Sequence, residues 1–174
     1  MAPALVDDLE KKTQQAPGID IPDIPVLCAQ GAGVCVFLDR EGELSRPLKG
    51  EVGRLLETNP PPLVCHAPWT AARLGLGGLE AFDILELFAF VHPGKFCVPT
   101  PTGMARALGI PDPEGAEDVP LSLLSAMQAL LGDLAKIPAD QKPPLLAMAG
   151  VMGLNGRGWK WTPFVFSALG ASYD

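Results

Sequence analysis

Short apolar segments separated by Gly- or Pro-containing turns dominate the first half of the chain. Most are rich in β-branched, aromatic or other apolar residues, a pattern typical of strands, and ELSR is expected to be a polar-faced strand. The segments are VLCA (26–29), VCVFLD (34–39), ELSR (43–46), LVCHA (63–67) and FDIL (82–85). The three-residue REG connection suits a hairpin, because Gly accepts a left-handed backbone. We therefore predict a three-strand antiparallel meander, followed by one or two parallel strands.

Helical periodicity takes over in the second half of the chain. In KGEVGRLLET (49–58), Val52, Leu55 and Leu56 fall on one face at spacings of three and four. The clearest helix is predicted within residues 119–137, with a stripe of Leu123, Leu124, Met127, Leu130 and Leu131. Further helices are predicted in WTAARLGL, ELFAF, PTPTGMARALGI, LLAMAGVMGL and TPFVFSALG. Few strands followed by several helices predict a mixed α/β fold, a small sheet flanked by helices.

Composition divides the 174 residues into a compact region and two ends. Residues 1–24 are predicted to form an extension with a short helix and a Pro-punctuated linker. Residues 25–137 form the predicted domain, and residues 138–174 form a linker and a Trp-rich helical tail. The uncharged final helix, PFVFSALG, predicts an exposed apolar patch of the kind that partners cover.

Charge and cysteine usage narrow the class of protein. The formal net charge of −7 argues against strong, independent binding to nucleic acid, which normally needs a basic face. The four cysteines form no C-x-x-C pair, and with two histidines the chain lacks zinc-finger spacing. We expect reduced core thiols in a cytoplasmic protein. No signal peptide or membrane-spanning run is visible.

Several phrases resemble a known family. DILELFAFVHP and PTPTGMARALG, together with PPLVCHAPWTAARLG and LLSAMQALLGDL, look like the N-terminal region of alphaproteobacterial DinG-type ATP-dependent DNA helicases. The tail NGRGWKWTPFVFSALG resembles the segment that precedes the helicase motor there. The element order also resembles the DnaQ-type 3′–5′ exonuclease domain of the ribonuclease-H-like fold. Together these resemblances span roughly residues 25 to 170 and imply a downstream helicase domain as partner.

Active exonucleases of that fold hold two divalent cations with four acids, because Mg²⁺ prefers carboxylate oxygens. The resemblance places the first two acids at Cys28 and Gln30, where both are lost. The family's His is kept at His66, but its next Asp becomes Thr70. The late helical acid would fall near Ser122 or Leu123. These vestigial positions imply that this chain holds no metal or other cofactor and that the domain alone is not an enzyme.

A literal D-x-E occurs elsewhere, at Asp39 and Glu41. In the predicted order these acids lie between the second and third strands, where Asp favours turns by bonding to nearby backbone. We interpret them as turn residues. The alternative is a residual Mg²⁺ site in an active metal-dependent nuclease.

Other catalytic motifs, including a P-loop and G-x-S-x-G, are absent from the sequence. Arg157, Trp159, Lys160 and Trp161 remain candidates for contact with single-stranded DNA or with the motor, because aromatics and cations can stack and pair with a strand. Anchoring of the tail to its own domain is the competing interpretation. We expect a non-catalytic accessory domain that organises the motor or weakly guides a DNA strand. Alternatives are an active nuclease and a free-standing protein-interaction domain.

Overall fold

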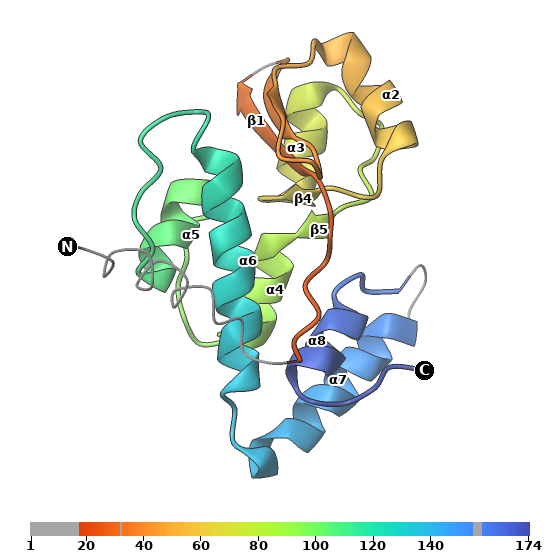
Figure 1. The fold of residues 1–174 in the computed structure, drawn as a ribbon, viewed down its shortest axis with the longest axis vertical. Helices are drawn as coiled ribbons and strands as arrows, with labels where there is room; N and C mark the ends of the chain where they lie inside the picture. Colours follow the sequence, from red (N-terminus) through yellow and green to blue (C-terminus); the bar gives the residue numbers. More distant parts are fainter. Residues whose placement is uncertain (1–17, 32, 155–157) are drawn as a thin grey trace, which may run out of the picture.

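The computed structural model describes residues 18–31, 33–154 and 158–174, and a five-stranded sheet lies at its centre (Figure 1). The strand order is β3-β2-β1-β4-β5. The strands are β1 (Val26–Gly31), β2 (Val34–Leu38), β3 (Leu44–Ser45), β4 (Leu63–Val64) and β5 (Phe82–Asp83). β1, β2 and β3 pair antiparallel, whereas β4 pairs parallel with both β1 and β5. The predicted mixed α/β fold is confirmed, and this arrangement is compatible with a ribonuclease-H-like sheet.

Helices cover both faces of the sheet. They are α2 (Lys49–Thr58), α3 (Ala67–Leu74), α4 (Ile84–Val91), α5 (Pro101–Leu108), α6 (Val119–Ala135), the short 3-10 helix η1 (Ala139–Gln141), α7 (Lys142–Leu154) and α8 (Thr162–Ala168). Side chains alternate across β1, as strand geometry requires. Val26 and Cys28 join a core with α4, α6 and α8, whereas Leu27 joins a second core with α2 and α3.

Helix α6 is the central packing element. Four residues of its predicted stripe, Leu123, Met127, Leu130 and Leu131, are each at most 1% exposed, whereas Leu124 is only partly buried. The helix contacts α4, α5, α8 and the sheet (Figure 1). An apolar stripe of this length stabilises the fold by removing several large side chains from water at once.

The C-terminal helix is buried, so the prediction of an exposed apolar patch on it is wrong. Val165, Ala168 and Leu169 are at most 4% exposed, because they face the core shared with α6 and are flanked by α7. Residues 158–174 therefore share one core with the sheet domain. On α7, by contrast, three apolar side chains are exposed: Met148, Val151 and Leu154 at 54%, 59% and 81%.

The segment before β1 is extended, as predicted, and it packs onto the domain. Ile19, Ile21 and Ile24 lie partly buried against the main core. The backbone N–H of Asp20 donates to Ser167 Oγ on α8 over 2.9 Å. Ordered packing therefore begins before the predicted start at Pro25, and the helix predicted N-terminal to Gly18 lies outside the described residues.

Candidate functional site

A pocket of about 300 Å³ lies where β1 and β4 run side by side and α3 begins. We call it the β1–β4 pocket. Its walls come from two strands' ends, the starts of α3 and α5, and one turn of α6. They consist of Cys28, Ala29, Cys65, His66, Trp69, Thr70, Pro99, Thr100, Pro101 and Leu123. Ligands of open α/β sheets commonly bind beside the carboxyl ends of parallel strands.

The pocket gathers most of the vestigial positions expected from the sequence. Cys28, His66 and Thr70 line it together with Leu123, which stands at the late helical position. Gln30 is exposed on β1 and is not among the lining residues. The family register places the lost acids on β1, α3 and α6. In the structure, neutral side chains from these three elements line one pocket.

His66 shapes the entrance to α3. Its backbone is left-handed, with φ 65°, an uncommon conformation for a residue other than Gly. The ring Nδ1 accepts a hydrogen bond from the Trp69 backbone N–H over 3.0 Å and caps the helix. Because Nδ1 is the acceptor, the neutral ring carries its proton on Nε2. His66 is thus a structural cap with one N–H donor left on the wall of the pocket.

Thr70 is a structural residue. It is 1% exposed, and its Oγ1 lies 3.1 Å from the His66 carbonyl oxygen and 3.3 Å from that of Cys65. The hydroxyl donates back to the preceding turn. It offers no anionic oxygen for a metal.

Asp83 is the acid that fastens this region, a role that the sequence did not reveal. It is 5% exposed and begins α4. Its Oδ1 accepts from the N–H groups of His66 (3.1 Å) and Leu85 (3.0 Å), and its Oδ2 accepts from that of Ala67 (2.7 Å). The sequence indicates only the cap on α4, since the other two donors lie 16 and 17 residues away.

The thiols in the pocket are neutral at ordinary pH. Burial raises the pKa of Cys65 to about 12, with a further contribution from the nearby Asp83 charge. Burial likewise raises the pKa of Cys28 far above its usual range. Buried thiols of this kind are inert, because the thiolate is the nucleophile and the metal ligand. All four cysteines are free, and Cys97 is the least buried.

The pocket does not fit Mg²⁺. Hard cations need several oxygen ligands, usually carboxylates, and the lining residues include none. The carboxylate of Asp83, which is bonded to the start of α3, accepts hydrogen bonds from three backbone donors. Within residues 18–31, 33–154 and 158–174, no group of three or more His, Cys, Asp or Glu side chains is arranged to hold a metal ion.

Asp39 and Glu41 lie in the turn between β2 and β3, away from the pocket. Asp39 Oδ1 accepts from the Glu43 N–H over 2.7 Å, and Gly42 takes the left-handed backbone with φ 89°. The turn follows Leu38, whose pairing partner Val26 begins β1, so it lies at the opposite end of β1 from the pocket. These acids therefore do not complete the vestigial site.

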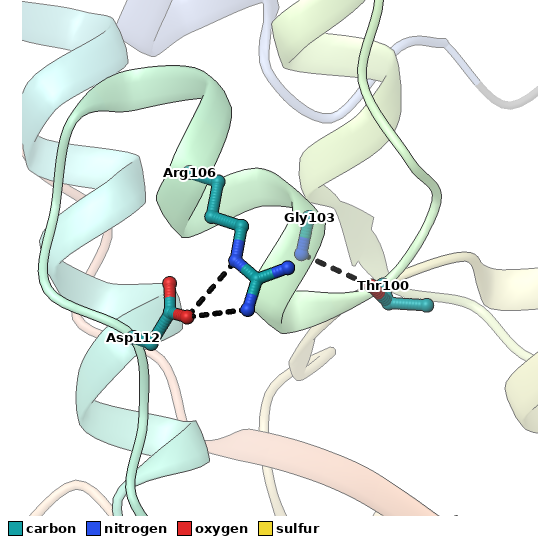
Figure 2. Close-up of polar contacts among 4 residues, drawn as sticks. All are labelled: Thr100, Gly103, Arg106 and Asp112. Carbon is teal, nitrogen blue, oxygen red and sulfur yellow. Dashed lines mark hydrogen bonds and ion pairs between the residues drawn. The ribbon is translucent and has the colours of Figure 1, made fainter.

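The loop before α5 contributes Pro99, Thr100 and Pro101 to the wall of the pocket. Figure 2 shows the polar contacts around the start of α5. Thr100 Oγ1 accepts from the Gly103 N–H over 3.0 Å and caps α5. A side chain at Gly103 would lie 2.2 Å from the Val98 carbonyl oxygen, so the close approach of this loop requires Gly. Arg106 then holds Asp112 through Nε and Nη2, at 2.9 and 2.7 Å, where the chain leaves the helix.

The Trp-rich tail divides into a buried part and a paired part. Trp161 is fully buried, donates Nε1–H to the Asp83 carbonyl over 2.9 Å and packs edge-on against Phe82. It is therefore a core residue, and its candidacy for DNA or motor contact is wrong. The Gly-rich sequence before Trp161 suggests a surface loop, but the Trp161 side chain is buried in the core of the domain.

The neighbours of Trp161 meet acids on the domain. Trp159 donates Nε1–H to Glu86 over 3.0 Å, and Lys160 Nζ lies 2.6 Å from Glu80. Burial raises the pKa of Glu86, an effect that the bond from Trp159 opposes. Arg157 lies outside the described residues. The tail is thus anchored to its own domain, and the Lys160 charge is already paired.

No protein-family model matches the chain, and neither a curated protein nor a solved structure matches it. None of the described helices is both long and apolar enough to cross a membrane.

Proposed function

We propose that this chain is a non-catalytic, exonuclease-like accessory domain that contacts and organises a DNA helicase motor. The observation that carries the proposal is the β1–β4 pocket. In the register that the resemblance implies, it gathers positions at which the resembled exonucleases carry their acids, and neutral Cys28, Thr70 and Leu123 line it. The sheet order, compatible with a ribonuclease-H-like fold, supports the same ancestry.

We propose a helicase motor as the partner because DILELFAFVHP, PTPTGMARALG and the tail resemble segments of DinG-type helicases. The exposed face of α7 supports a contact with protein. Met148, Val151 and Leu154 lie one helical turn apart and are each more than half exposed. Such a contiguous apolar stripe, without a charged residue from Pro143 to Leu154, is the kind of surface that partner proteins cover.

Guidance of a DNA strand has weaker support. Lys160 is paired with Glu80, and Trp161 is buried, so two of the tail candidates are not available to a strand. The net charge of −7 would also repel phosphates. Contact with the motor through α7 is therefore better supported than guidance of a DNA strand by the tail.

The test is direct binding between the purified chain and a helicase motor of the resembled type from the same genome, measured by calorimetry. The double variant Met148→Lys/Val151→Lys is expected to abolish binding, because two charges would be buried without partners. Leu121→Lys is the matched control, since Leu121 is 56% exposed on α6. Absence of binding by the unmodified chain would refute the proposal and favour a free-standing interaction domain.

A further inference from the structure

The β1–β4 pocket is larger than a lost metal site requires. Its volume of about 300 Å³ exceeds that of engineered apolar cavities of about 150 Å³, which take up benzene. It also reaches the lower end of the range typical of small-molecule sites, roughly 300–1,000 Å³. Trp69, 40% exposed, supplies an aromatic wall, and Leu123 and the Pro99–Pro101 loop supply aliphatic walls.

The charges at the pocket give little support for binding an anion. No Lys or Arg lines it. Arg73, one turn along α3 from Trp69, lies over that ring at 5.1 Å and is not a lining residue. Asp83, just behind the start of α3, adds a negative charge nearby.

The start of α3 at the pocket is also closed to anions. The Ala67 N–H donates to Asp83, the Trp69 N–H to the His66 ring, and the Thr70 N–H to the His66 carbonyl. Pro68, which lies between them, has no N–H to offer. At the start of α3 a phosphate or carboxylate therefore meets none of the free donors that make helix N-termini anion sites.

Few polar groups on the wall are left to recognise a ligand. The capping bond uses His66 Nδ1, so the proton is on Nε2 and can be donated. The Thr70 hydroxyl donates to backbone carbonyls, whereas Thr100 Oγ1 accepts from the Gly103 N–H and keeps its own O–H. The pocket thus combines apolar walls with a small number of neutral polar groups, among them the ring N–H of His66.

From this arrangement we infer that the β1–β4 pocket binds a small, uncharged, ring-bearing molecule through apolar contact and one hydrogen bond from His66 to an acceptor on the ligand. The inference rests on the proposed loss of the metal site, since the same residues line both. It goes beyond that loss, because it assigns a ligand class that excludes phosphate and carboxylate.

The experiment uses two probes of nearly equal shape. Acetophenone is neutral and carries a carbonyl acceptor, whereas benzoate is an anion. Titration of each into the isotope-labelled full chain at pH 7 is followed by shifts of backbone amide signals around the pocket. Acetophenone is expected to bind at least about tenfold more tightly, because an unpaired carboxylate is costly to bury. Equal binding, tighter benzoate binding or no acetophenone binding would overturn the inference.

Two separate variants fill the pocket, so that the test can still be made if one of them fails to fold. Leu123→Trp and Cys28→Leu each add bulk to a wall and are expected to weaken acetophenone by about tenfold or more. Leu121→Trp places the same side chain on the exposed face of α6 and is expected to leave binding unchanged. Unchanged binding in a folded pocket variant would place the probe elsewhere and overturn the inference.

The role of His66 is tested by His66→Asn. Asn tolerates the left-handed backbone and can cap α3 through its side-chain oxygen, but it lacks the ring N–H. Acetophenone should weaken by about three- to tenfold, the value of one hydrogen bond, while ethylbenzene, which has no acceptor, should not weaken selectively. Equal effects on both probes would contradict the hydrogen bond. Benzoate preference would defeat only this inference, whereas Mg²⁺-dependent DNA hydrolysis would defeat the proposed function.

Discussion

Asp83 gives the sharpest quantitative prediction. Its carboxylate accepts three backbone N–H bonds that join α4 to the start of α3, and it is 5% exposed. Hydrogen bonds to charged groups contribute about 1.5–3 kcal/mol each, and a buried donor left unpaired costs about 1–3 kcal/mol. Because the three bonds share one acceptor, we expect Asp83→Ala to lower the free energy of unfolding by about 3–5 kcal/mol.

The Asp83→Asn variant distinguishes the contributions of the two carboxylate oxygens to stability. The amide oxygen can keep the bonds from His66 and Leu85, but its NH₂ group then faces the Ala67 N–H, and two donors cannot pair. A loss of about 1.5–3 kcal/mol is expected, smaller than that of the alanine variant.

Urea unfolding followed by circular dichroism measures both variants. With a slope of about 2 kcal/mol per M, Asp83→Ala should lower the midpoint by about 1.5–2.5 M without changing the slope. Glu117→Ala is the control, since Glu117 makes an exposed ion pair with Arg46, a kind of contact that adds little. An alanine variant of Asp83 as stable as this control would refute the structural role and leave the acid free for chemistry.

The remaining predictions concern the tail and the thiols. In urea unfolding, Trp161→Ala should lower the free energy of unfolding by about 3–5 kcal/mol, because Trp161 is fully buried. Trp159→Ala should cost clearly less, because Trp159 is half-buried. Equal losses would contradict the role of Trp161 as the buried anchor of the tail. Because burial raises the pKa of Cys65 from 9.0 to about 12, its stabilising contribution is complete below pH 9 and is lost between pH 9 and pH 12. Unfolding free energies measured across that window should fall by up to about 1.4 kcal/mol per pH unit more steeply than in Cys65→Ala, and identical slopes would refute the shift. At pH 8 iodoacetamide should label Cys97 before Cys65 in the folded chain, as peptide mass mapping can show, whereas labelling in the reverse order would contradict the burial.

The order of elements could be predicted because each obeys a local rule. Val52, Leu55 and Leu56 repeat at helical spacing, and the Asp39 turn has its Gly where a left-handed residue is needed. The fold class followed from that order alone. The gathering of Cys28, Thr70 and Leu123 at one pocket followed from the family register, since no local pattern joins three such distant positions.

Long-range packing set the limit of prediction. An uncharged helix such as α8 suits either a buried or a partner-covered position, and only the positions of α6 and α7 decide between them. Trp161 was missed for the same reason, because its partners Phe82 and Asp83 lie far away in the sequence. The pocket itself depends on the Pro99–Pro101 loop, whose approach to α3 no sequence pattern indicates.

The central claim is that the chain has lost nuclease chemistry, and hydrolysis of labelled single-stranded DNA by the full chain tests it most directly. With either Mg²⁺ or Mn²⁺ present, we predict no hydrolysis above that of the Asp39→Ala/Glu41→Ala variant. DNA degradation that requires the cation and disappears in that variant would contradict the account.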